Sequence, residues 1–109
     1  AEVGFESKTN VNRNDPALTR RLQPSLAAVV GADNAIEMPL QTVAEDFGYF
    51  AAEVPGFYYF VGSTPEGSDP RTAPANHSPR YFVDERALDV GVRTMLQVTA
   101  DFLTAAPAR

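Results

Sequence analysis

The chain has 109 residues, a formal net charge of −5 at pH 7 and no cysteine. This length predicts one domain or part of one, and the lack of cysteine excludes a disulfide framework, a thiolate metal cage and a thiol nucleophile. The acidic balance argues against a nucleic-acid partner. No apolar run approaches the roughly 18 residues of a membrane span, so we expect no membrane partner and a cytoplasmic setting by default.

The first predicted element is a half-buried strand over residues 3–11. One set of side chains recurs at every second position, the period of a strand, at Val3, Phe5, Ser7, Thr9 and Val11. A strand needs neighbours, and the chain offers only one more convincing strand. The chain also begins without an initiator methionine or a signal sequence. We therefore expect it to be a piece of a larger protein.

A helix is predicted over residues 16–30. Asp15 is of a residue type that caps the free amides of a helix start, and Pro16 fits the first helical position, where its missing N–H has no partner to lose. Apolar residues follow at helical spacing, and Gly31 is suited to end the helix. Pro24 removes one internal hydrogen bond, so we expect a kink or two short helices.

A second helix is predicted from a capping box at Thr42–Glu45, with Phe47, Phe50 and Ala51 following on one face. Residues 36–40 precede it and are expected to form a short strand or an extended entry to the helix.

The run Phe57–Val61 is aromatic and β-branched without interruption, which predicts a central strand covered on both faces. Residues 63–83 follow without periodicity and predict a long loop, a feature that is usually functional or disordered. Asp84 then opens the clearest helix, which ends before Pro107. Its apolar stripe consists of Leu88, Val92, Met95, Leu96, Thr99 and Phe102 or Leu103. This order of elements indicates an α/β arrangement.

His77 is the only histidine and lies in the long loop after the predicted central strand. In open α/β sheets, ligands bind beyond the carboxyl ends of the strands, so this position suits a metal ligand or a general base. A surface histidine without a role is the alternative. Asn76 and Ser78–Pro79 beside it are turn formers that would constrain it.

Glu45 and Asp46 are adjacent carboxylates at the start of the second predicted helix. The positive end of the helix dipole favours negative charge there, and the capping box already accounts for Glu45. Asp46 is more available to bind a ligand or to support one. The residues alone favour a structural role for both.

Several motifs follow one another in an order that resembles the carboxy-terminal part of the metal-dependent amidohydrolases related to aminoacylase, hippurate hydrolase and the plant auxin-conjugate hydrolases. They are Ala44–Phe50, Val54–Gly56, the Phe57–Gly62 strand, Asn76–Pro79 and Phe82–Gly91. The earlier segment Val11–Leu18, which contains Asn14–Pro16, also resembles the family's return from its lid domain into its catalytic domain. Each motif is weak alone, and the series in this order is specific.

The resemblance implies an α/β fold. The chain would be the second half of a three-layer catalytic domain, with helices on a mostly parallel sheet, preceded by one strand of a lid domain. Residues 1–12 would be the last strand of the lid, or dimerisation, domain, and residues 13–109 the C-terminal half of the catalytic metallohydrolase domain. The parent protein would be a homo-oligomer.

The resemblance also implies a two-metal site, commonly zinc and sometimes manganese, cobalt or nickel, which activates a water for attack on an amide carbonyl. His77 falls on the family's final metal-ligand histidine. The neighbouring Glu45, Asp46, Asn76 and Ser78 would shape the substrate site or support its ligands.

The family's other metal ligands and its glutamate general base have no counterpart in this chain. A catalytic metal needs about three protein ligands, so the chain alone is expected to be inactive. The resemblance predicts a fragment of a hydrolase that cleaves N-acyl amino acids or similar small amides. The alternative is a non-catalytic α/β module that binds a protein partner, or self-associates, through an exposed apolar patch.

Overall fold

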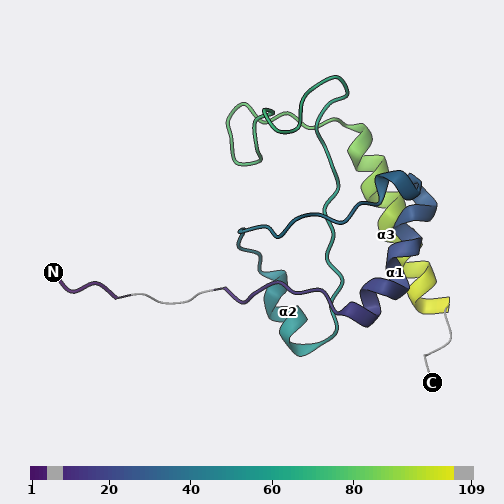
Figure 1. Cartoon of the computed structure of the whole chain (residues 1–109), viewed down its shortest axis with the longest axis horizontal. Coiled ribbons are helices and arrows are strands. Elements are labelled where there is room, and N and C mark those ends of the chain that lie inside the picture. The colour runs from purple at the N-terminus through teal and green to yellow at the C-terminus, as the bar shows by residue number, and fades with distance from the viewer. Residues whose placement is uncertain (5–8, 105–109) are drawn as a thin grey trace.

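The computed structural model describes residues 1–4 and 9–104, and in that part of the chain it contains three α-helices and one 3-10 turn. Helices α1 (Pro16–Val30) and α3 (Arg86–Thr104) pack side by side, and α2 (Phe47–Glu53) lies apart from them (Figure 1). The 3-10 turn η1 (Ala32–Asn34) follows α1 directly. Long irregular and extended segments connect these elements.

The α/β fold class expected from the sequence is wrong for this structure, because no strand and no sheet form among the described residues. Phe57–Val61, the expected central strand, pairs with no second strand. A strand exists only as part of a hydrogen-bonded ladder between neighbouring segments, and the described chain provides no neighbouring strand. The layered half-domain of helices on a parallel sheet is therefore absent from this part of the chain.

The other two strand predictions have different outcomes. Residues 36–40 form no strand, which leaves the extended entry as the alternative that fits. The strand expected over residues 3–11 falls partly on residues 5–8, which lie outside the described residues. The described residues on either side, 3–4 and 9–11, form no strand.

Local signals set the limits of α1 as expected. The Asp15 carboxylate accepts a 2.7 Å hydrogen bond from the amide of Leu18, and Pro16 occupies the first helical position. Gly31 ends the helix at φ 86°, a left-handed angle that favours glycine. The helix continues through Pro24 as one element, not as two short ones.

Helix α2 begins later than the capping box predicted, so that prediction is wrong. Its first hydrogen bonds run from the amides of Gly48 and Tyr49 back to the carbonyls of Glu45 and Asp46, and Phe47 is its first residue. A close tertiary contact lies at this first turn. A Cβ on Gly48 would lie 2.7 Å from the carbonyl oxygen of Asn10, so the chain around Asn10 packs directly on the backbone of the first turn.

Helix α3 packs on α1 through small and polar side chains. Leu22 and Ser25 of α1 and Thr94 of α3 are the buried residues of the two helices. Leu22 is the only buried hydrophobic side chain in the described chain. The pairing of the two long helices therefore rests on a very small core.

The apolar stripe predicted for α3 exists, but most of it is exposed and does not pack on α1. Leu88, Val92, Met95 and Leu96 are 63%, 61%, 57% and 65% exposed. The radius of gyration is 16.7 Å, whereas a compact domain of this length has a value of about 13 Å. The described chain thus leaves its most apolar helical face without a partner.

The extended segment Phe57–Val61 is held on one side by a side-chain clamp. Asn14 donates its Nδ2 to the carbonyl of Tyr58 at 2.7 Å and accepts the amide of Tyr58 on its Oδ1 at 2.7 Å. The amide of Asp15 donates to the carbonyl of Gly56 at 2.8 Å. The start of α1 and the extended segment are therefore joined by three hydrogen bonds.

We expect Asn14→Ala to lower the free energy of unfolding by about 1–3 kcal/mol, because it removes two hydrogen bonds and leaves both backbone groups of Tyr58 unpaired. Urea unfolding followed by circular dichroism measures the change. Asn34→Ala is the matched control, because the Asn34 side chain makes one exposed bond, to the carbonyl of Val30. Equal effects of the two substitutions would contradict the clamp.

Candidate site in the loop before α3

The loop between the extended segment and α3 is closed at its base. The amide of Asp84 donates to the carbonyl of Ser63 at 2.9 Å, and the hydroxyls of Ser63 and Tyr81 lie 2.7 Å apart in a hydrogen bond. Arg86, the first residue of α3, reaches back into the loop and pairs with Glu66 at 2.9 Å. The loop over residues 63–84 is therefore anchored at its base, and Figure 1 shows it beside the N-terminal end of α3.

His77 lies in a tight turn within this loop. The amide of Ser78 donates to the carbonyl of Ala75 at 3.1 Å, and the amide of Tyr81 donates to the carbonyl of Ser78 at 3.0 Å. The φ of His77 is 70°, and no other described non-glycine residue has a positive φ. Histidine is among the few residue types enriched in this left-handed region. The turn formers around His77 thus constrain its backbone, as the sequence indicated.

The His77 side chain is exposed and makes no hydrogen bond or ion pair with a described residue. Asn76 is also exposed. Ser78 is half-buried, and its hydroxyl accepts the amide of Arg80 at 3.2 Å. Ser78 therefore serves the turn itself, whereas the imidazole is presented outward and is available to a ligand.

Glu45 and Asp46 lie just before α2, not in its first turn. Glu45 is half-buried beside Tyr58. Burial, with a smaller effect from the charge of Glu45 and its hydrogen bond, raises the pKa of the Tyr58 phenol. Asp46 is exposed, and its side chain caps no amide of the helix. The Glu45 side chain thus has a structural partner, whereas Asp46 does not.

The described chain does not bring these residues together. Helix α2 and the loop over residues 63–84 lie toward opposite ends of the extended segment (Figure 1). Among the described residues no three His, Cys, Asp or Glu side chains are placed to hold a metal ion. The site residues expected from the sequence fall into two separate groups, Asn76–Ser78 and Glu45–Asp46.

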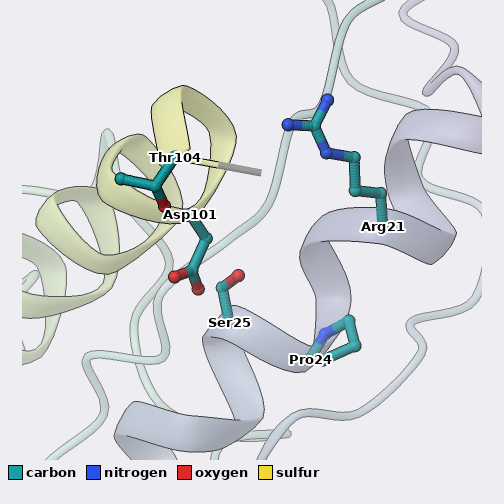
Figure 2. A pocket seen from close by; sticks show the side chains of 5 residues that line it. All are labelled: Arg21, Pro24, Ser25, Asp101 and Thr104. Atoms are coloured by element: carbon teal, nitrogen blue, oxygen red, sulfur yellow. The ribbon is translucent and has the colours of Figure 1, made fainter. Parts of the chain in front are cut away.

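A pocket between the C-terminal half of α3 and the middle of α1 was not anticipated from the sequence. Figure 2 shows it lined by Arg21, Pro24, Ser25, Asp101 and Thr104. A hydrogen bond from Ser25, with a smaller contribution from Gln97, lowers the pKa of Asp101. Ser25 stands one helical turn after the buried Leu22, and this spacing is the signal that could have identified it. No histidine lines the pocket to activate the serine, so its geometry describes a helix–helix contact.

Arg21 of α1 takes part in the same helix–helix contact through Phe102 of α3. Its guanidinium lies 4.9 Å from the centre of the Phe102 ring and donates a 2.6 Å hydrogen bond to the carbonyl of Phe102. A cation over an aromatic face contributes about 0.5–1 kcal/mol at an exposed site. This contact holds the end of α3 against α1.

Lowering the pH is expected to destabilise the base of the loop, because the Asp84 carboxylate becomes protonated. Hydrogen bonds from Arg86 lower the pKa of the Asp84 carboxyl from 3.8 to about 2. A lowered pKa means that the ionised carboxylate stabilises the folded state. This stabilisation is complete when the pH is above the pKa of the unfolded state, and it is lost as the pH falls below the pKa of the folded state. The loss should therefore occur between about pH 4 and pH 2.

Asp84→Asn should flatten the fall of stability in this pH range and lower stability at neutral pH. The urea midpoint measured at a series of pH values tests this. Asp33→Asn is the control, because the Asp33 carboxylate makes no hydrogen bond or ion pair with a described residue. An unchanged pH profile in Asp84→Asn would remove this role from Asp84.

In the described residues, no helix has the length and apolarity required to cross a membrane.

Comparison with known proteins gives a family match over most of the chain. The model of peptidase family M20/M25/M40 matches residues 1–101. The IAA-amino acid hydrolase ILR1-like 4 of Arabidopsis thaliana is 29% identical over 90 residues, which cover 83% of this chain and 20% of the plant protein. The putative amidohydrolase YhaA of Bacillus subtilis is 31% identical over 75 residues, which cover 69% of this chain and 18% of that protein.

A relative with a different name also matches. The putative glutamate–cysteine ligase 2-3 of Rhodococcus jostii is 35% identical over 86 residues, 79% of this chain and 10% of that protein. No solved structure matches at comparable significance. The chain thus spans a fifth or less of the length of these three relatives.

Proposed function

Because the chain belongs to peptidase family M20/M25/M40, we propose that it is part of a longer hydrolase that cleaves the amide bond of N-acyl amino acids or similar small amides. The observation that carries this proposal is the family match over residues 1–101. Relatives named as an amino acid hydrolase and an amidohydrolase support the substrate class. The same proposal includes the domain assignment. Residues 1–12 would be the last lid strand, and residues 13–109 would be the second half of the catalytic domain.

The donor set of the described chain fits one ligand of a metal site and not a complete site. A catalytic metal needs about three protein ligands, and the described residues contain no such group. His77 would hold one of two divalent ions, zinc or else manganese, cobalt or nickel, because an exposed neutral imidazole suits these metals. Such ions lower the pKa of a water and polarise a carbonyl. The remaining ligands would come from outside the described chain.

The chain's own residues would position this ligand. The left-handed φ of His77 and the hydrogen bond from the Ser78 amide to the Ala75 carbonyl set the backbone position from which the imidazole projects, and the Ser78 hydroxyl accepts the amide of Arg80 just after it. Asn76 is exposed next to it and is available for a substrate or for a neighbouring ligand. Glu45 and Asp46 would shape the substrate site from the side of α2, with Tyr58 holding Glu45 in place.

The coding region that surrounds this chain provides the first test. We expect an open reading frame that supplies the four-fifths of the plant relative's length that the match does not cover. It should carry a His-x-Asp or Cys-x-His metal motif and a Glu-Glu pair. A stop codon followed by a start codon near Ala1 would favour the module alternative.

Activity is the second test. The purified longer protein should hydrolyse N-acetyl and N-benzoyl amino acids, lose this activity to a chelator and regain it with zinc or manganese. The isolated chain, assayed in parallel, should be inactive. A metal-loaded longer protein that hydrolyses none of these amides would contradict the proposal.

A non-catalytic binding module is the second candidate, and the exposed apolar face of α3 favours it. Such a module would bind a protein partner or a second copy through this face. Sedimentation of the isolated chain over a range of concentrations distinguishes the two candidates. Tight self-association of a chain encoded alone would support the module.

A further inference from the structure

The pocket between α1 and the end of α3 carries two opposite charges that the described chain does not neutralise. Arg21 of α1 and Asp101 of α3 both line the pocket, and neither makes an ion pair with a described residue. Figure 2 shows the guanidinium and the carboxylate on opposite sides of the pocket, with Ser25 beside the carboxylate. A ligand between them would therefore meet a cation at one end and an anion at the other.

The Asp101 carboxylate is held in place by neutral donors. The Nε2 of Gln97 donates to its two oxygens at 3.0 and 3.1 Å. The hydroxyl of Ser25, which is only 4% exposed, also hydrogen-bonds to it, and this bond is the largest cause of the lowered pKa of Asp101. A carboxylate offers about four acceptor positions, so one remains for a ligand. The group is ionised at neutral pH and keeps its full negative charge.

The Arg21 guanidinium is likewise fixed, and most of its donors remain available. It lies 4.9 Å from the centre of the Phe102 ring and donates from Nη2 to the carbonyl of Phe102 at 2.6 Å. Guanidinium has about five N–H donors in a rigid fork that suits a carboxylate, and only Nη2 is bonded to a described residue. The contact between α1 and α3 therefore positions a group that can bind a second carboxylate.

The pocket is small and separate from the loop that carries His77. Its volume is about 340 Å³, near the lower limit of about 300 Å³ for small-molecule sites. Asp101 and Thr104 lie in the last turn of α3, whereas the loop lies beside the N-terminal end of that helix (Figure 1). The helix has 19 residues, which corresponds to about 28 Å. A ligand of this pocket is therefore small and binds apart from His77.

We propose that this pocket binds a small zwitterion of the amino acid type, with its carboxylate on Arg21 and its ammonium group on Asp101. A simple anion would be repelled by Asp101 and a simple cation by Arg21, so a molecule that carries both charges fits the two sides best. Pro24 adds an apolar wall for a short aliphatic side chain. The inference does not depend on the proposed function. If both are correct, the amino acid released by hydrolysis belongs to this ligand class.

Ligand analogues test the proposal without any change to the protein. In NMR spectra of the 109-residue chain, L-alanine should cause saturable shifts of the amides of Ser25 and Asp101 and of the Arg21 side chain. N-acetylalanine lacks the ammonium group, and alanine amide lacks the carboxylate. Each should bind at least about 10-fold more weakly at the same ionic strength, because each loses hydrogen bonds between charged groups. N-acetylalanine belongs to the proposed substrate class, so this order of affinities distinguishes the pocket from a hydrolytic site.

Variants locate the binding. Asp101→Asn keeps the size of the side chain and should weaken the binding of L-alanine at least about 10-fold. Asp33→Asn, at an exposed carboxylate outside the pocket, should leave it unchanged. Arg21→Gln should weaken binding similarly, and Arg20→Gln is its control, because Arg20 is exposed and bonds no described residue. Since Arg21→Gln also removes the contact with Phe102, circular dichroism must show that the helices of this variant remain.

Three results would overturn the proposal. The first is a chain without helical circular dichroism, because the pairing of α1 and α3 builds the pocket. The second is the absence of saturable shifts near Ser25 and Asp101. The third is equal binding of L-alanine, N-acetylalanine and alanine amide, or an Asp101→Asn variant that binds L-alanine as well as the unmodified chain. Binding is measured without hydrolysis, so an inactive longer protein would remove the proposed function and leave this inference standing.

Discussion

Substituting His77 with asparagine is expected to lower kcat/KM of the proposed longer hydrolase at least about 100-fold, because even residues that only support a metal ligand contribute about 10–100-fold. The bound metal should fall in parallel. Asparagine is chosen because it tolerates the left-handed φ of 70° at this position. The turn therefore stays intact while the imidazole is lost. Steady-state kinetics with an N-acyl amino acid and metal analysis of the same preparation measure both effects.

Arg80→Gln is the matched control, since Arg80 is exposed in the same loop and its side chain has no described partner. Its kinetics and metal content should stay close to those of the unmodified protein. If His77→Asn also leaves both unchanged, His77 is the surface histidine without a role that the sequence left as an alternative.

Leu96→Ala is expected to destabilise the longer protein by about 2–5 kcal/mol, the usual cost of truncating a buried leucine. The same substitution should change the isolated chain by no more than about 0.5 kcal/mol, because Leu96 is 65% exposed there. The difference arises only if something outside the chain covers α3. Urea unfolding of both proteins, with and without the substitution, measures it.

Arg93→Ala controls for general effects of alanine in α3. Arg93 is exposed, and its ion pair with Asp89 is long, at 3.4 Å, so the substitution should have a small effect in both proteins. A small effect of Leu96→Ala in the longer protein would show that the apolar stripe stays open to solvent and would favour a binding surface for another molecule.

The helices that the sequence predicts well are those defined by signals within a few residues. Asp15, Pro16 and Gly31 fix the ends of α1 because a cap acts on its own turn. Asp84 similarly accepts the amide of Arg86 at the start of α3. The predicted start of α2 is wrong, since Glu45 of the capping box hydrogen-bonds Tyr58, a residue far from it in sequence, and Phe47 is the first residue of the helix.

The sheet could not be predicted correctly from the same information. Phe57–Val61 has the composition of a strand, but pairing depends on a neighbour that the described chain does not supply. The stripe of α3 was likewise identified as one apolar face, whereas the direction in which it faces depends on tertiary packing. Periodicity reveals which residues share a face and not what covers that face.

In the candidate site, too, the features set by nearby residues were predicted and those that depend on distant residues were not. His77 was identified as the only histidine of a long loop, and its turn is formed by the neighbours that the sequence indicated. Which carboxylates approach it depends on distant parts of the chain, and in the described residues Glu45 and Asp46 do not. The contact between Ser25 and Asp101 went unnoticed because a serine within an apolar run carries little signal of its own.

The hydrogen bond between Ser63 and Asp84 at the base of the loop has a consequence for protein engineering. A loop whose ends are tied together can change length without moving the elements on either side, and doubling its length adds only about 0.6 kcal/mol of closure entropy. The turn around Gly67 is exposed and has open space at its Cα. A peptide tag or a fluorescent label inserted there should leave α3 in its place.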